Sequence, residues 1–358
     1  MASKVRHLLG ISGGKDSAAL SIYMNRTYPE LDIEYYNSDT GCELQETIEF
    51  VDNLKSYLGK PITTLCATDG MLEKTPFDYF LKMYNGFLPS VKARWCTLKM
   101  KLDEFEKYVG DTPTVSYVAI RGDEDRDGYI STKPNIQAIF PFRRNIWSTD
   151  VIKEVLDNKN IVKFKECYEG RCEVIDKQTG DAFTLKAKLN VLLETDTVAF
   201  NHAVYLYLKK YTQLPVGMLD SFPLLENEDV IVKDDVYRIL QESGVGIPAY
   251  YNLIDFEVGG KKGQYCRSRS GCYFCFFQQK IEWIWLYEQH PDLYAKAMEY
   301  EKDGYTWIQG ESLKDLARPE RIRQIKLEQI RKTEAEKTRR KSLVDILGEQ
   351  GTNEFDSI

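Results

Sequence analysis

One short segment near the start of the chain limits its possible folds more than any other. Residues 5–11 form an apolar run with the length of a buried strand, and the sequence SGGKDS follows at 12–17. Residues 16–27 then have the composition of a helix. Glycines allow a sharp turn that points several N–H groups inward, and a helix N-terminus carries partial positive charge. This strand, loop and helix therefore predict a cradle for the phosphates of a nucleotide.

The rest of the first 145 residues alternates in the same way. Residues 31–37, 61–67 and 114–120 are further strand candidates, while 44–58 and 96–109 have the apolar spacing of amphipathic helices. Strands that alternate with helices predict an α/β fold with a doubly wound parallel sheet. In such a sheet ligands bind at the carboxyl ends of the strands. We therefore expect residues 1–145 to form a nucleotide-binding domain.

The remaining chain has a different character. Residues 146–255 read as a helical region, and the alternation of apolar and polar residues over about 160–190 predicts an inserted β-meander. Residues 256–358 begin with a segment rich in glycine, cysteine and arginine and end in a basic helical tail. We expect this smaller C-terminal part to be helical and to carry a cysteine cluster.

Composition excludes several classes of protein. With 43% hydrophobic and 29% charged residues among 358, the chain is neither disordered nor fibrous. It has no apolar run long enough to span a bilayer, and its first residues lack the pattern of a signal peptide. We therefore expect a cytoplasmic protein that does not bind membranes. A net charge of −7 argues against a protein that covers nucleic acid with its whole surface.

Several motifs together resemble one superfamily. The SGGKDS loop is similar to the PP-loop of the ATP pyrophosphatases, which cleave ATP between its α and β phosphates. The segments NSDTGCE at 37–43, RWCTLK at 94–99 and AIRGDEDR at 119–126 resemble segments of its phosphoadenosine-phosphosulfate reductase branch. The branch has an arginine one place after Arg126, where this chain has Asp127. The resemblance covers roughly residues 5–145 and 230–285.

The cysteines narrow the resemblance further. Cys272 and Cys275 form a Cys-x-x-Cys pair, a usual way to bind a metal or cluster, and Cys266 lies shortly before them. With Cys96 they resemble the four cysteine ligands of the DndC/SspD-like proteins of DNA phosphorothioation. That resemblance implies a 4Fe–4S cluster, while the residues alone leave a zinc site or plain buried thiols open. The chain has only three scattered histidines, so a histidine-rich metal site is not expected.

The resemblance also implies an activity and its residues. The protein would use ATP and Mg²⁺ to adenylylate a DNA backbone phosphate, which sulfur then attacks. Asp39 would position Mg²⁺ or the ribose, and the basic residues would neutralise developing charge. A cysteine desulfurase would donate the sulfur, and other DNA-modification subunits would be partners. The residues that would hold the pyrophosphate are Ser12, Gly13, Gly14, Lys15, Asp16 and Ser17, and the basic residues are Lys99, Arg121 and Arg126.

Different functions stay open at this point. A sulfonucleotide reductase needs a nucleophilic cysteine near its C-terminus. No cysteine follows Cys275, so the sequence argues against this function. A tRNA-thiolation enzyme and a non-catalytic, ATP-binding iron–sulfur scaffold also fit the sequence. The tail at 318–341 has ten lysines and arginines against four glutamates, and it either docks as a solvated helix or binds DNA or a partner.

Overall fold

The computed structural model describes residues 4–68, 75–126, 128–168, 184–269, 271–302 and 304–351. The chain divides into two compact units. Unit 1 comprises Met1–Pro76 and Thr97–Pro248, and unit 2 comprises Phe77–Cys96 and Ala249–Ile358. Unit 1 thus includes most of the region expected to be helical, while a short piece of the N-terminal 145 residues belongs to unit 2.

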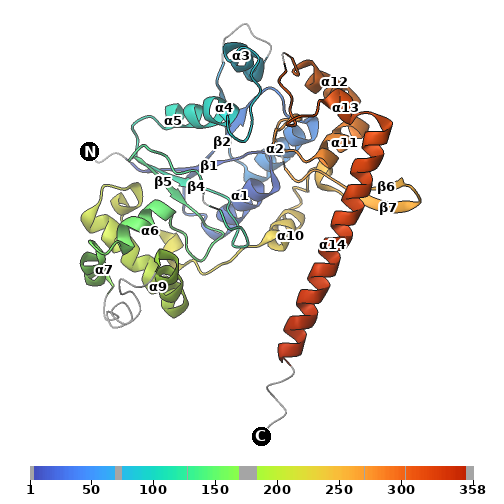
Figure 1. The fold of residues 1–358 in the computed structure, drawn as a ribbon. Helices are drawn as coiled ribbons and strands as arrows, with labels where there is room; N and C mark the ends of the chain where they lie inside the picture. The colour runs from blue at the N-terminus through green and yellow to red at the C-terminus, as the bar shows by residue number, and fades with distance from the viewer. Residues whose placement is uncertain are drawn as a thin grey trace. The chain divides into compact units, whose positions relative to one another are not determined.

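A five-stranded, wholly parallel sheet forms the centre of unit 1 (Figure 1). Its strand order is β3-β2-β1-β4-β5, so the order reverses direction between β1 and β4. The predicted α/β class with a parallel sheet is confirmed. The strands are β1 (Arg6–Gly10), β2 (Ile33–Asp39), β3 (Ile62–Cys66), β4 (Thr114–Tyr117) and β5 (Ile136–Ile139).

Helices cover both faces of this sheet. Leu9 of β1 belongs to a large core that includes side chains of several helices, while its neighbour Leu8 packs with Phe105 and Val109 in a second, smaller cluster. Successive side chains of a strand point to opposite faces, so the two clusters lie on opposite sides. These helices include α1 (Lys15–Thr27), α2 (Gln45–Leu58), α6 (Thr149–Leu156), α9 (Leu185–Tyr211) and α10 (Lys233–Ser243).

The predicted helix at 96–109 forms in three pieces. It starts as α4 (Trp95–Thr97), continues as a π-helix η1 (Leu98–Leu102) and ends as α5 (Asp103–Val109). The four predicted strands and the helices at 16–27 and 44–58 are also found, with ends shifted by a few residues at most. Strand β5 was not predicted.

The predicted β-meander is wrong where the structure describes it. The segment begins as helix α7 (Ile161–Cys167), and α9 starts at Leu185. Phe164 of α7 is fully buried, and its ring lies 6.0 Å from that of Phe200 on α9. Helix packing of this apolar face therefore overrides the apparent alternation. Residues 169–183 lie outside the described part of the chain.

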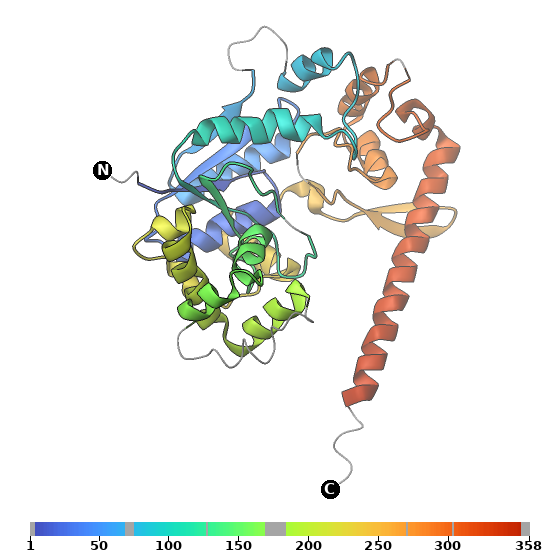
Figure 2. The ribbon, with the colours of Figure 1, turned by 60° about the vertical axis from the view of Figure 1, so that its left-hand side comes forward.

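Unit 2 is built on a hairpin and a long helix. Strands β6 (Ile254–Val258) and β7 (Lys261–Tyr265) pair antiparallel and lie against α14 (Pro319–Gly351), as Figures 1 and 2 show. A Cβ atom on Gly263 would stand 2.7 Å from Cγ1 of Ile330, so this close approach requires glycine. Further helices of unit 2 are α3 (Pro76–Met83), the 3-10 helix η4 (Ala249–Tyr251), α11 (Lys280–Gln289), α12 (Pro291–Glu299) and α13 (Leu313–Leu316).

The first part of the basic tail is docked. Ile325 and Ile330 are buried, and three cations of this stretch form ion pairs with unit 2: Arg318 with Asp315, Arg321 with Glu311 and Lys326 with Glu288. Among the described side chains, no ion pair involves the tail cations Arg323, Arg331, Lys332 and Lys337. The tail therefore combines a docked start with a charged continuation. Within the described residues, no helix has the length and apolar character needed to cross a membrane.

Candidate functional site

The loop after β1 has a backbone that only glycine adopts without strain. Gly13 has φ of +70°, and a Cβ atom there would lie 2.3 Å from Cγ2 of Thr47. Gly14 is extended and caps α1, which begins at Lys15. The chain thus turns directly from the end of the strand into the N-terminus of a helix, the geometry that binds phosphate groups.

Two serines hold this loop together. Oγ of Ser17 accepts a hydrogen bond from the N–H of Ser12 at 3.1 Å and lies 3.0 Å from Oγ of Ser12. It also lies 3.1 Å from the carbonyl oxygen of Gly14, to which it donates. The N–H of Gly14 in turn donates to Oγ of Ser12 at 3.3 Å. The loop is therefore held in shape before any ligand enters.

A chain of charges links this loop to the loop after β4. The side chain of Lys15 is buried, and its Nζ lies 3.3 Å from Oδ2 of Asp16. The other carboxylate oxygen of Asp16, Oδ1, lies 2.7 Å from Nη1 of Arg121. Nε of Arg121 also donates to Asp123 at 2.8 Å. Burial opposes the charge of Arg121, but hydrogen bonds to Asp16 and Asp123 outweigh it and raise its pKa. These residues meet where the strand order reverses, the usual ligand site of such sheets.

The loop after β4 is fixed by an arginine that sequence reasoning missed. Arg143 donates from Nε to the carbonyl of Arg121 at 3.2 Å and from Nη2 to the carbonyls of Glu124 at 2.5 Å and Arg126 at 2.9 Å. The predicted residue Arg126 is mostly exposed and pairs with Glu124 at 3.1 Å. No local motif marks Arg143, because its role depends on a loop about 20 residues earlier in the chain.

The end of β2 carries two carboxylates. Asp39 accepts the N–H of Gly41 at 2.7 Å, and Glu43 accepts both the N–H of Thr40 at 3.3 Å and its hydroxyl at 2.5 Å. Burial raises the pKa of Glu43, and the nearby charge of Asp39 adds to this effect. Two neighbouring carboxylates of this kind suit a hard divalent cation such as Mg²⁺.

The predicted Lys99 lies on the π-helix η1. Its Nζ is 2.8 Å from Oδ2 of Asp103, one turn further along the helix. Lys101, which the sequence reasoning did not select, lies close enough to Glu43 for its charge to lower the pKa of that carboxyl. The π-helix therefore supplies a cation to the acidic end of β2.

The cysteine segment lies in unit 2, and aromatic rings tie its parts together. Cys266 directly follows β7, and the N–H of Cys275 donates to the carbonyl of Cys272 at 3.2 Å in a tight turn. The ring of Phe77 lies 5.2 Å from Trp95, the neighbour of Cys96, and 4.3 Å from Phe274, the neighbour of Cys275. The side chains of all four predicted cysteines are half-buried.

A buried guanidinium lies beside these thiols. Arg267 is 1% exposed, and its Nη2 donates to the carbonyl of Cys272 at 3.1 Å. Its Nε and Nη1 have no hydrogen-bond partner among the described residues. Burial lowers the pKa of Arg267, while the charges of Glu282, Cys275 and Cys272 oppose that change. Since an uncompensated buried charge is costly, this side chain fits a negatively charged group at the thiols.

The described residues contain no group of three or more histidine, cysteine, aspartate or glutamate side chains arranged to hold a metal ion. The donor set nevertheless fits a thiolate-bound metal, since four half-buried cysteines belong to one unit and two nitrogens of the buried Arg267 guanidinium lack a hydrogen-bond partner among the described residues. Both an iron–sulfur cluster and zinc would meet this description.

Comparison with known proteins gives only distant relatives. No protein-family model matches the chain. The chain is 28% identical over 160 residues to one uncharacterized protein of Methanocaldococcus jannaschii. These aligned residues make up 41% of this chain and 36% of that protein. It is 26% identical over 146 residues to a second uncharacterized protein of the same organism. This alignment covers 37% of this chain and 28% of the relative. The similarity thus spans only about a third of the length of each of these relatives.

Proposed function

We propose that this protein is an ATP pyrophosphatase that adenylylates a DNA backbone phosphate so that sulfur can replace one of its oxygens. A non-bridging phosphate oxygen is a very poor leaving group. When that oxygen attacks the α-phosphorus of ATP, pyrophosphate leaves and the oxygen becomes part of an AMP leaving group. Such a modification would serve anti-phage defence in the cytoplasm of a bacterium.

In the first step, the residues of unit 1 would bind the leaving pyrophosphate. The N–H groups at the start of α1 and the ammonium of Lys15 face the developing negative charge, and Arg121 adds a second cation. Asp39 and Glu43 would hold the Mg²⁺ that bridges the phosphates. Asp16 would orient Arg121, to which it is bonded at 2.7 Å.

In the second step, sulfur displaces AMP. The terminal sulfur of a persulfide, formed by a cysteine desulfurase, would attack the activated phosphorus and form the P–S bond. A second thiol would then take the inner sulfur into a disulfide and release the phosphorothioate. An iron–sulfur cluster held by Cys96, Cys266, Cys272 and Cys275 would supply electron-transfer or sulfur-transfer chemistry.

One observation carries the proposal: the preorganised glycine loop lies between β1 and α1, and Asp16 links it to Arg121 after β4. This arrangement offers backbone donors and two cations at the switch point of a parallel sheet. It lacks the Gly-x₄-Gly-Lys-Ser/Thr spacing of loops that release the terminal phosphate alone. The geometry therefore fits the binding of a leaving pyrophosphate, which the resemblance to the PP-loop implies.

Chromatography of the reaction products tests the first step. With Mg²⁺ we expect AMP and pyrophosphate, formed slowly in the absence of DNA and partners. Lys15→Ala and Asp16→Asn should abolish the reaction and leave circular dichroism unchanged. Lys60→Ala, which removes a half-buried lysine paired with Asp32, is the matched control. ADP and phosphate as products would refute the proposed chemistry.

Metal analysis of anaerobically purified protein tests the cysteine site. We expect a brown protein with broad absorbance near roughly 400 nm and about four irons per chain. Cys272→Ser should lose the iron, and Cys66→Ser, which changes a thiol of unit 1, should not. A colourless protein with about one zinc per chain would show that the cysteines bind a structural zinc ion instead of an iron–sulfur cluster.

A further inference from the structure

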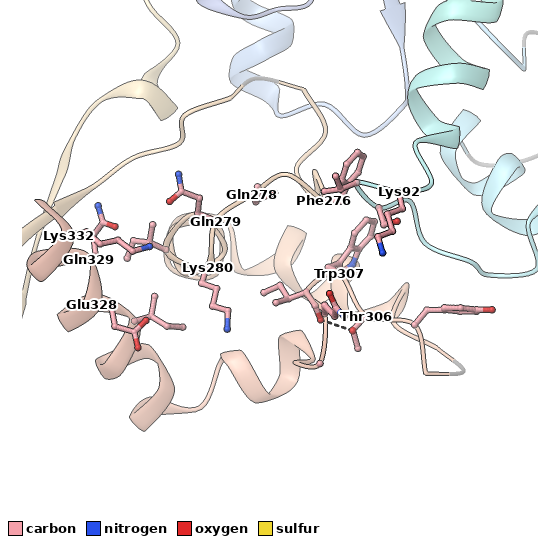
Figure 3. Close-up of a pocket in the computed structure, with 18 of the residues that line it drawn as sticks. Lys92, Phe276, Gln278, Gln279, Lys280, Thr306, Trp307, Glu328, Gln329 and Lys332 are labelled. Atoms are coloured by element: carbon pink, nitrogen blue, oxygen red, sulfur yellow. Dashed lines mark hydrogen bonds between the residues drawn. The ribbon is translucent and has the colours of Figure 1, made fainter. Parts of the chain in front are cut away.

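A cavity of about 980 Å³ lies within unit 2, and none of the cysteines that the structure describes lines it (Figure 3). Its wall comes from four parts of the chain: residues 90–92, the chain from Phe276 into α11, the loop 304–310, and α14. The volume is at the upper end of the range of about 300–1,000 Å³ for small-molecule sites. The nucleotide chemistry proposed for unit 1 does not use this cavity.

The cavity wall is basic. Lys92, Lys280 and Lys332 line it, against a single carboxylate from Glu328. Lys280 is already held by Glu311 at 2.6 Å. In the described part of the chain no ion pair involves Lys92 or Lys332, which Figure 3 shows at different sides of the cavity. Their charges are therefore available to an anion.

The wall also carries four carboxamides and exposed aromatic surface. Gln278, Gln279, Gln309 and Gln329 all line the cavity. Gln278 is 8% exposed, and both polar atoms of its amide lack a hydrogen-bond partner among the described residues. Tyr305, in the loop 304–310, is 37% exposed. A carboxamide can both donate to and accept from the edge of a base, and an exposed ring can stack on its face.

We propose that this cavity binds an unpaired nucleotide of a single-stranded nucleic acid. Tyr305 stacks on the base, and Gln278 hydrogen-bonds to its edge. Lys92 and Lys332 contact the phosphates on either side. The inference deepens the proposed function and rests on it in one respect, since the strand bound here would be the acceptor of the sulfur.

The surroundings favour a strand over a small metabolite. Gln329 and Lys332 belong to α14, whose charged continuation includes Arg331 and Lys337. A free nucleotide would need only the cations of the cavity, whereas a polymer can also use other cations of α14 outside it. A base inside the cavity must leave a duplex stack, so the site selects single strands.

Fluorescence anisotropy without ATP tests the proposal on the full chain. The probes are a labelled single-stranded DNA of about 12 nucleotides, the same sequence as RNA, and the duplex DNA, each at about 50 mM and about 200 mM salt. We expect a single strand to bind more tightly than the duplex, and more weakly at the higher salt. Whether DNA or RNA binds better identifies the strand.

Matched variants assign the binding to the cavity. Tyr305→Ala should weaken single-strand binding about tenfold, and Tyr305→Phe should restore it. Tyr287→Ala, which removes a ring of similar exposure on α11, should bind as wild type. Lys92→Glu should weaken binding and reduce its salt dependence, whereas Lys296→Glu, an exposed lysine of α12 outside the cavity, should do so much less.

Two results would overturn the inference: equal binding of duplex and single strand, or Tyr305→Ala and Lys92→Glu variants that bind as wild type. Because no ATP is present, neither result depends on whether unit 1 cleaves ATP. Conversely, if the chain binds the strand through Tyr305 but forms no AMP, the nucleotide site in the cavity is supported and the proposed ATP pyrophosphatase function is refuted.

Discussion

Replacing Arg267 by methionine should have opposite effects on the metal-free and the metal-loaded protein. In the metal-free chain, this buried guanidinium has one hydrogen bond, to the carbonyl of Cys272, and two N–H groups without partners among the described residues. Methionine keeps much of the side-chain volume and removes the charge. Metal-free Arg267→Met should therefore be at least as stable as wild type.

The structure sets the size of this effect. Each unpartnered buried N–H costs about 1–3 kcal/mol, and the single bond to Cys272 contributes about 1.5–3 kcal/mol. At the middle of these ranges the two unpartnered groups cost about 4 kcal/mol and the bond contributes about 2 kcal/mol, so their loss leaves the metal-free variant roughly 2 kcal/mol more stable. With a negatively charged thiolate site filled, the same substitution removes the counter-charge and should destabilise the protein by about 3–5 kcal/mol.

Urea unfolding followed by tryptophan fluorescence measures both values. Four of the five tryptophans, Trp95, Trp283, Trp285 and Trp307, belong to unit 2, so the signal reports mainly on that unit. Arg269→Met is the control, since Arg269 is exposed in the same segment and should change neither form by more than about 0.5 kcal/mol. An equal change in metal-free and loaded protein would refute the argument that a bound anion partners Arg267.

Three further predictions concern the nucleotide loop, the acidic residue that anchors α14, and the tail. Gly13→Ala should abolish ATP cleavage while circular dichroism stays unchanged. Alanine at φ +70° costs about 1–2 kcal/mol, and its Cβ would displace Thr47. Retained cleavage would contradict the role of the turn. A hydrogen bond from Arg321 lowers the pKa of Glu311 to about 2. The ionised Glu311 therefore stabilises the folded protein above its unfolded pKa of about 4.3, and this stabilisation is lost as the pH falls towards 2. Glu311→Gln should thus cost about 1 kcal/mol in urea unfolding at pH 7 and progressively less below about pH 4; a cost independent of pH would show another origin. Truncation after Ile330 should leave unfolding unchanged and weaken DNA binding at low salt more than at high salt, and loss of partner binding alone would assign the tail to assembly.

Local sequence predicted the elements that position the nucleotide loop. Strand β1 and helix α1 follow from an apolar run, two adjacent glycines and a helix start, all within the first 27 residues. Helix α2 also ends where predicted, because Gly59 adopts φ of +61° at its C-cap. These signals act over a few residues, so no tertiary information was needed.

Other features depend on contacts that sequence spacing does not reveal. Strand β5 has four residues, and its buried polar residue Gln137 accepts a hydrogen bond from the N–H of Val216, far along the chain. Helix α7 carries its apolar residues in a pattern that also fits a strand, and only packing on α9 decides between them. Arg143 acts through the carbonyls of a distant loop, which no motif encodes.

The π-helix η1 also determines how this chain can be compared with others. A π turn holds one residue more than an α turn, so side chains after Leu102 are rotated by about 100° from where a continuous α-helix would place them. Phe105 and Val109 reach the sheet only in this rotated frame. A chain with an ordinary α turn here would need one residue fewer to bury the same two side chains. The two halves of this helix should therefore be aligned independently, and a one-residue gap between them should be kept as a genuine feature of the fold.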